Sequence, residues 1–176
     1  MPHDYRMKRI IFLDFDGVLN TEKYQNQLKI NGEKRDDDFG SLFDPESVKN
    51  LKTILDAVPD ALLVVTSTWK DVLGEDEIYR LWDERKMPGR IYGLTRPYMP
   101  DFSSFDPETD NFSIMAGKGY EVKQWINGHA KGGCRYVILD DMSYFLPEQQ
   151  PYHVKVDAFN GITKDNVAEA LSILNA

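Results

Sequence analysis

The sequence predicts an α/β protein with a doubly wound, Rossmann-like parallel sheet flanked by helices. Four short apolar runs are rich in Val, Ile and Leu and do not alternate with polar residues; they lie at 10–15, 61–66 and 136–139 and, more weakly, at 153–156. Uninterrupted apolarity over this length is typical of strands that are covered on both faces. Helical patterns lie between the runs, and this alternation predicts right-handed βαβ units. Functional side chains should therefore gather at the carboxyl ends of the strands.

Four helices are expected to accompany these strands. The clearest begins at Pro45, because Asp44 is a favourable N-cap and proline suits the first helical position. Apolar residues recur behind it at helical spacing. The other three are expected over 75–86, from Gly117 to the Asn127–Gly128 pair, and behind an N-cap at Thr163.

Two stretches do not fit the alternation. Residues 31–43 are polar, with a run of charged side chains, and are expected to form a surface loop. Residues 98–113 combine acidic and aromatic side chains without a basic residue, and a loop of this length in a small domain is usually functional or disordered. Its aromatic residues could stack on a nucleobase, but packing of the loop onto the domain is the commoner use.

Composition favours a single domain over residues 1–176, with 41% hydrophobic and 28% charged residues. The net charge of −8 argues against general binding to nucleic acid or to an anionic membrane, which usually requires a basic surface. It does not exclude a small anionic substrate that is bound by a metal ion and a few local Lys or Arg residues.

Several absences in the sequence point to the cytoplasm. Cys134 is the only cysteine, so an intramolecular disulfide is impossible. No apolar stretch approaches the about 20 residues of a membrane span, and the first residues lack the apolar core of a signal peptide. We therefore expect a reducing, cytoplasmic compartment and no membrane partner.

The first strand is followed directly by two carboxylates, Asp14 and Asp16, and then by Gly17. Side chains two residues apart in a strand share a face, so the two carboxylates should point the same way. Like charges at this distance repel unless a cation lies between them or one carries a proton. The alternative is a turn with two solvated Asp residues, since Asp-x-Asp-Gly is also a good turn sequence.

Polar groups at two predicted helix starts suit an anion. Thr66 and Ser67 follow the second strand, where their hydroxyls and backbone amides would cradle a phosphate or simply cap a helix. Lys118 opens the third helix, where its charge opposes the helix dipole. Its position suggests a nearby anion or carboxylate, although a surface Lys would also reach water there.

Two more carboxylates, Asp140 and Asp141, follow the third strand. A hard divalent cation would stabilise them together with the first pair. Alternatively, one of the two caps the following turn. The sequence leaves open which of Asp140 and Asp141 would contact a metal directly.

These four elements, in this order, resemble the haloacid dehalogenase (HAD) superfamily over residues 10–141. The resemblance implies a doubly wound core, a nucleophilic aspartate and Mg²⁺ as cofactor. The segments between the motifs are too short for a large cap domain. By position, the resemblance assigns the nucleophile to Asp14, the general acid and base to Asp16, phosphate binding to Thr66, Ser67 and Lys118, and the metal to Asp14, Asp16 through its carbonyl, Asp140 and Asp141.

Three shorter motifs, at 16–20, 66–70 and 160–163, are similar to a HAD branch associated with RNA-repair proteins. Asn20 and Lys70 end two of these motifs and could touch substrate, or serve the turn and the helix surface.

The expected function is a Mg²⁺-dependent phosphatase that acts on a phosphomonoester through an aspartyl-phosphate. Its substrate would be a phosphorylated small molecule or a nucleic-acid end. The alternatives are a nucleic-acid-end phosphatase of RNA or DNA repair, phosphotransfer or phosphonate chemistry on the same core, and a binding module without catalysis.

Overall fold

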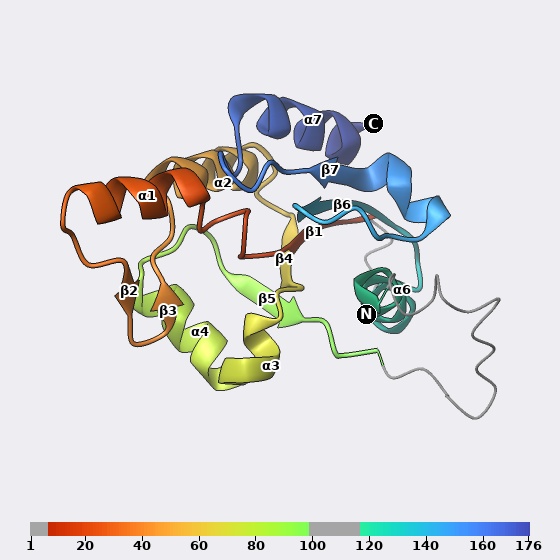
Figure 1. Ribbon diagram of the computed structural model, residues 1–176. Coiled ribbons are helices and arrows are strands. Elements are labelled where there is room, and N and C mark those ends of the chain that lie inside the picture. Colours follow the sequence, from red (N-terminus) through yellow and green to blue (C-terminus); the bar gives the residue numbers. More distant parts are fainter. Residues whose placement is uncertain (1–6, 99–116) are drawn as a thin grey trace, which may run out of the picture.

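Five parallel strands form the central sheet of the computed structural model, which describes residues 7–98 and 117–176 (Figure 1). The strand order is β5-β4-β1-β6-β7, so the chain winds outward from β1 first to one side and then to the other. This confirms the predicted doubly wound α/β fold. The strands are β1 (Lys8–Leu13), β4 (Leu62–Val65), β5 (Ile91–Leu94), β6 (Cys134–Asp140) and β7 (His153–Lys155).

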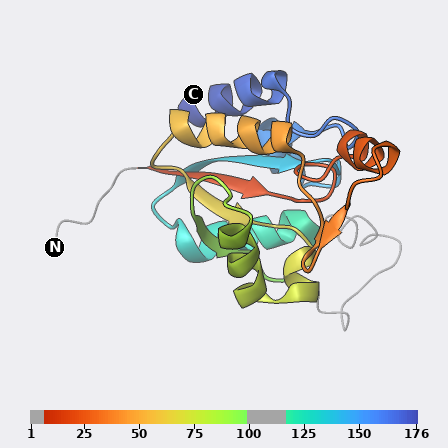
Figure 2. The same cartoon turned by 90° about the vertical axis from the view of Figure 1, so that its left-hand side faces the viewer.

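Helices cover both faces of this sheet. Figure 2 shows α2 (Pro45–Ala57) and α7 (Lys164–Asn175) on one face and α6 (Gly117–His129) on the other. The N-caps expected for α2 and α7 are present, since Asp44 and Thr163 accept backbone N–H groups of their helices. The remaining elements are α1 (Glu22–Ile30), α3 (Trp69–Leu73), α4 (Glu75–Glu84), the 3₁₀ helix η2 (Pro147–Tyr152) and a hairpin of β2 (Asp36–Asp37) and β3 (Gly40–Ser41). Within the described ranges, no helix combines the length and apolarity needed to cross a bilayer.

Alternate side chains of β1 build the two halves of the core. Ile11 and Leu13 pack with α2, α4 and α7, whereas Ile10 and Phe12 pack with α6. The Phe12 ring meets Trp125 edge-on, with centroids 5.6 Å apart. Because these four side chains are fully buried, this part of β1 had to be apolar, as its sequence indicated.

Some elements differ from the prediction. The strand β5 was missed because it is short, contains Gly93 and lies at the sheet edge with only Ile91 buried. The helix α1 was missed because Leu28 is its only buried residue, which leaves no apolar stripe. The expected surface loop 31–43 contains the hairpin β2–β3, and α6 continues to His129, beyond its expected end.

The acidic and aromatic segment 98–113 lies outside the described residues except for Tyr98, which stacks on Tyr120 at 4.6 Å.

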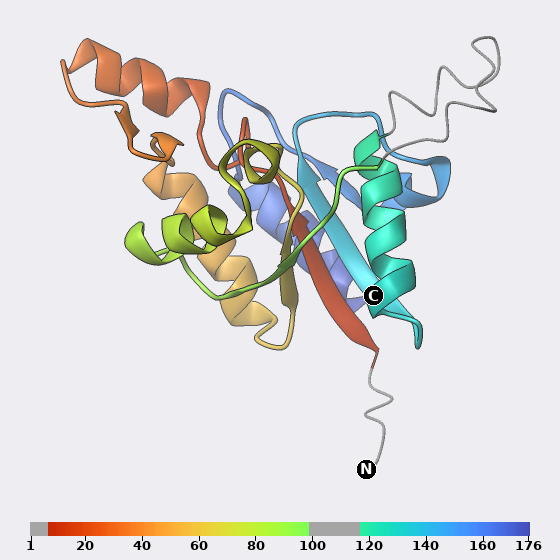
Figure 3. The same ribbon diagram turned by 90° about the horizontal axis from the view of Figure 1, so that it is seen from below.

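Backbone hydrogen bonds continue across the sheet just beyond the strand ends. The N–H of Asp14 donates to Leu139, that of Thr66 to Leu13, and that of Thr95 to Val65, over 2.9–3.1 Å. Thr95, Thr66 and Asp14 therefore stand in one row, about 4.8 Å apart from strand to strand. Figure 3 shows α1 and α3 at this same end of the sheet. The polar side chains that follow the strands therefore lie together at the carboxyl edge of the sheet.

Candidate active site

Three carboxylates converge where β1 and β6 end side by side. Asp14, Asp140 and Asp141 each present an oxygen within 4.8 Å of the others. Asp14 is 4% exposed and Asp140 is completely buried, so water reaches neither freely. The strands explain this arrangement, because β1 and β6 are parallel neighbours and Asp14 pairs through its backbone with Leu139. The two carboxylate pairs predicted from sequence thus contribute to one group.

One ammonium group lies among these carboxylates. Lys118, the second residue of α6, places its Nζ 3.0 Å from Oδ2 of Asp14 and 2.8 Å from Oδ2 of Asp140. The other oxygen of Asp140 accepts the backbone N–H of Met142 at 2.8 Å. The position of Lys118 at the helix start, unfavourable for the helix dipole, is therefore explained by its two carboxylate partners.

The electrostatics of the group reflect an excess of negative charge. Burial and the nearby Asp140 raise the pKa of Asp14 from 3.8 to about 6, although Lys118 opposes this shift. Burial also raises the pKa values of Asp140 and Asp141. For Lys118, burial acts to lower the pKa, but Asp14 and Asp140 outweigh it and the pKa is raised. Three carboxylates that share one ammonium match the donor set of a hard divalent cation such as Mg²⁺.

The chain passes close to these carboxylates at Gly17, which has a φ of +72°. A Cβ atom at this position would lie 2.5 Å from Oδ2 of Asp141 and 3.0 Å from Cβ of Ala158. Only glycine avoids both the clash and the strained backbone. The Asp-x-Asp-Gly sequence therefore forms a tight turn and also leaves room for Asp141.

Asp16 differs from Asp14 in its surroundings. It lies in a turn in which the carbonyl of Phe15 accepts three backbone N–H groups, and its side chain is exposed. Its Oδ1 accepts hydrogen bonds from Nδ2 of Asn20 at 2.7 Å and from Nε1 of Trp69 at 3.0 Å. Asp16 is not among the three grouped carboxylates, but it lines the same cavity of about 360 Å³ as Asp14 and Lys118.

The two predicted phosphate-binding hydroxyls have different environments. Oγ1 of Thr66 is buried, and no hydrogen-bond partner for it occurs in the described part of the chain. A buried hydroxyl without a partner is costly, so a bound oxygen would stabilise it. Oγ of Ser67, by contrast, accepts the backbone N–H of Trp69 at 3.3 Å, as a helix cap would.

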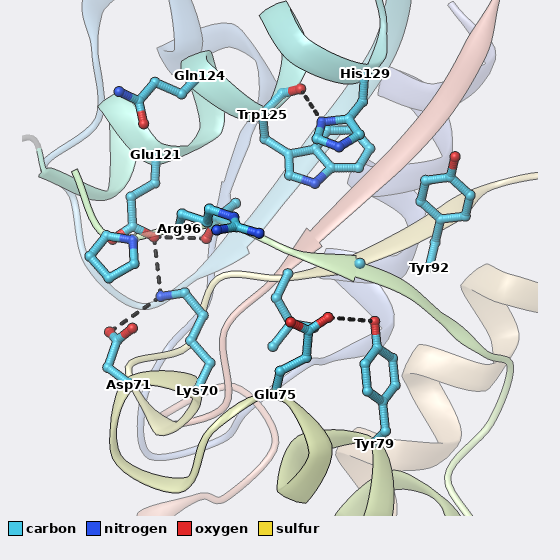
Figure 4. A pocket seen from close by; sticks show the side chains of 14 residues that line it. Lys70, Asp71, Glu75, Tyr79, Tyr92, Arg96, Glu121, Gln124, Trp125 and His129 are labelled. Carbon is cyan, nitrogen blue, oxygen red and sulfur yellow. Dashed lines mark hydrogen bonds and ion pairs between the residues drawn. The ribbon is translucent and has the colours of Figure 1, made fainter.

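Lys70 forms a second charged cluster beside this site (Figure 4). Its Nζ lies 3.2 Å from Oε2 of Glu121 and 3.3 Å from Oδ2 of Asp71. Glu121 also accepts the hydroxyl of Thr95 at 2.7 Å. Lys70 and Glu121 are 7% and 9% exposed, and they border a cavity of about 550 Å³ that Trp125 also lines. Lys70 is therefore held by its protein partners, consistent with a structural role.

Sequence reasoning missed two residues that border the site. Thr68 lines both cavities that contain Asp16, the second of which has about 420 Å³ and lies between the β2–β3 hairpin and α3. Trp69 contacts Asp16 directly. They stand at the start of α3, Thr68 as its N-cap and Trp69 as its first residue, but nothing in a lone Thr or Trp indicates which carboxylate it will face.

Comparison with known families gives one match. A family model described as "HAD domain in Swiss Army Knife RNA repair proteins" matches residues 10–167. The matched segment contains the three carboxylates, Lys118 and Thr66. No curated protein and no solved structure matches the chain.

Proposed function

The chain belongs to the family of HAD domains in Swiss Army Knife RNA repair proteins, and from this membership we propose that it is a Mg²⁺-dependent phosphatase that acts through an aspartyl-phosphate. The observation that carries the proposal is the convergence of three carboxylates within 4.8 Å around a single Lys. Such a group of like charges is unfavourable without a cation, and phosphoryl transfer requires charge neutralisation at the reacting phosphate.

The metal would be held by the side chains of Asp14, Asp140 and Asp141 together with the carbonyl of Asp16. Bound there, Mg²⁺ would neutralise charge on the phosphoryl oxygens and on the carboxylates. The donor set supports this role, since it consists of oxygen atoms from partly or fully buried carboxylates.

In the first step, an oxygen of Asp14 forms a bond to phosphorus as the bond between phosphorus and the leaving oxygen breaks. Asp16 donates its proton to that leaving oxygen. Lys118 holds Asp14 through its 3.0 Å contact and supports the ionised form that the attack requires. Thr66 offers its buried hydroxyl to a phosphoryl oxygen.

In the second step, water attacks the phosphorus of the aspartyl-phosphate. Asp16, now ionised, takes the proton of this water, and the bond between Asp14 and phosphorus breaks. Inorganic phosphate leaves and both carboxyls return to their starting states. Asp14 thus begins the cycle ionised, which its contact with Lys118 at 3.0 Å supports, and Asp16 begins it as the proton donor.

We further propose that the phosphorylated substrate is a nucleic-acid end. The family description supports this, and so do two apolar side chains at the site. Met142 and Tyr144 are 46% and 45% exposed, and both line the cavity that contains Asp14 and Lys118. An exposed aromatic ring beside the reacting phosphate would stack on a base, and stacking tolerates any sequence.

Phosphate release from a substrate panel tests both proposals. The purified chain is incubated with sugar phosphates, mononucleotides and oligonucleotides phosphorylated at the 3′ or 5′ end, with Mg²⁺ or with EDTA. We expect release only with Mg²⁺ and fastest from oligonucleotide ends. No release from any substrate would contradict the phosphatase and favour a binding module. Faster release from sugar phosphates than from oligonucleotides would contradict the nucleic-acid end as substrate but not the phosphatase activity.

A further inference from the structure

Trp69 makes a polar contact that the phosphatase mechanism has not yet used. Its indole Nε1 donates a hydrogen bond to Oδ1 of Asp16 at 3.0 Å. Nδ2 of Asn20 donates to the same oxygen at 2.7 Å. Two N–H donors, one from the turn itself and one from α3, therefore converge on one carboxyl oxygen.

These donors decide where a proton on Asp16 can reside. An indole N–H and an amide NH₂ can donate but not accept, so Oδ1 must act as an acceptor toward both. A proton on Oδ1 would compete with them for the space around that oxygen. The acidic proton of Asp16 is therefore confined to Oδ2, and the carboxyl group cannot rotate without breaking both hydrogen bonds.

The indole ring itself is held in place by its neighbours. The rings of Phe15 and Phe43 each lie 5.7 Å from it, centroid to centroid. The backbone of the hairpin passes so close at Gly40 that a Cβ atom there would lie 3.2 Å from the indole. The guanidinium of Arg85 lies 5.7 Å from the ring centre and also binds Asp37 of the hairpin. The Nε1 atom thus has a fixed direction toward Asp16.

We propose that Trp69 is a positioning residue, which holds Asp16 with its proton on Oδ2 so that this proton is delivered to the leaving oxygen. The proposal rests on the assignment of Asp16 as general acid in the proposed phosphatase. It also gives the hairpin β2–β3 a role, since this hairpin packs the indole against the turn that carries Asp16.

The chain offers a matched control for Trp69. Trp82 stacks on the same Phe15 ring, with centroids 6.1 Å apart, but its buried Nε1 has no hydrogen-bond partner in the described segments. Trp69→Phe and Trp82→Phe therefore both remove part of an indole from one aromatic cluster. Only the first removes a donor to Asp16.

The test compares two phosphate esters for the wild type and both variants, with Mg²⁺. Glycerol phosphate has a poor leaving group that needs a proton, whereas p-nitrophenyl phosphate has an activated one. For Trp69→Phe, we expect kcat/KM for glycerol phosphate to fall about tenfold or more relative to that for p-nitrophenyl phosphate, a part of the about 10²–10⁴-fold that an acid contributes. For Trp82→Phe, the ratio of the two values should match that of the wild type.

A Trp69→Phe variant that loses the same factor on both esters would overturn the proposal. A wild type that is inactive on every ester would instead contradict the proposed function. In that case the contact is tested without activity, by the indole N–H signals of the three Trp residues in ¹H–¹⁵N NMR. Asp16→Ala should shift the Trp69 signal and leave the Trp82 signal in place, and an unmoved Trp69 signal would overturn the positioning role.

Discussion

Two charged clusters lie at the same edge of the sheet, on either side of Thr66, and they differ in charge balance. In the first, the buried Lys70 faces the buried Glu121, and Thr95 supplies a further hydrogen bond. In the second, Lys118 contacts Asp14 and Asp140, and Asp141 adds a third carboxylate to the same group. The same helix contributes to both clusters, since α6 carries Lys118 and, one turn later, Glu121.

The difference in charge balance indicates which cluster stabilises the fold and which is suited to bind a cation or take part in a reaction. A buried pair of opposite charges is satisfied within the protein once its hydrogen bonds are made. Three carboxylates beside one ammonium group are not satisfied in this way. Burial, together with the neighbouring carboxylates, raises the pKa values of Asp14, Asp140 and Asp141. A protein retains such an imbalance where a cation or a reacting group relieves it, and perturbed carboxyls in a cavity are typical of functional sites.

Among the variants that distinguish the two clusters, Asp14→Asn is expected to have the largest effect. Removing the nucleophile should lower kcat for any accepted phosphate ester by about 10⁴-fold or more. The fold should persist, because an amide replaces the carboxylate with the same shape and less repulsion. Phosphate release and far-UV circular dichroism measure the two effects. Activity within tenfold of the wild type would remove Asp14 as nucleophile.

The next largest effect is on stability and falls on the other cluster. Glu121→Ala leaves the buried charge of Lys70 with only the exposed Asp71, and we expect a loss of about 3 kcal/mol in the free energy of unfolding. Urea unfolding measures this loss. The double variant Lys70→Met with Glu121→Leu should regain most of it, because two apolar side chains leave no charge unpaired. A loss below about 1 kcal/mol for Glu121→Ala would show that the pair is not a stability determinant.

The pH dependence of stability should reveal the raised pKa of Asp14 in the Lys118 cluster. Burial and Asp140 raise the pKa of Asp14 to about 6, so the folded chain holds a proton that the unfolded chain loses near pH 4. This contribution is fully present below pH 4 and is lost as the pH rises through 6. Without Mg²⁺ it corresponds to about 3 kcal/mol for this carboxyl.

The measurement is urea unfolding in EDTA between pH 4 and 7, for the wild type and for Asp14→Asn. The variant cannot titrate at this position, so its stability should fall less over this range. Parallel curves for the two proteins would contradict the assignment of the raised pKa to Asp14.

The smallest effect concerns the space at Gly17. Gly17→Ala places a methyl group 2.5 Å from Oδ2 of Asp141 and should weaken Mg²⁺ binding as that carboxylate is displaced. Backbone strain at the positive φ adds a cost of about 1–2 kcal/mol. Gly74→Ala is the control, because Gly74 has a φ of +88° and nothing lies within 4 Å of its Cβ position. Both variants should lose stability, but only Gly17→Ala should lose thermal stabilisation by Mg²⁺.

The parts of the fold that sequence predicted are those whose residues face the core on every side. The runs that became β1, β4 and β6 are apolar without a break because α helices cover both of their faces. The edge strand β5 and the helix α1 face solvent over much of their surface, so neither carries a strong pattern. Tertiary contacts, and not local preference, fix these two elements.

The residues of the candidate site also divide into those that the sequence could place and those that depend on tertiary contacts. Asp14, Thr66 and Asp140 could be placed together because residues at parallel strand ends meet at one edge. The contact between Trp69 and Asp16 could not be predicted from the sequence, because it depends on the direction of α3 and on where the hairpin packs. Likewise, no local pattern pairs Lys70 with Glu121, which stand on different helices.

Calorimetric titration of Mg²⁺ into the metal-free chain is the most direct test of a divalent-cation site at the three carboxylates. We expect one Mg²⁺ per wild-type chain, loss of this binding in Asp141→Asn, and unchanged binding in Asp71→Asn, which removes a carboxylate from the Lys70 cluster instead. The absence of binding to the wild type, or equal binding to Asp141→Asn, would contradict the account.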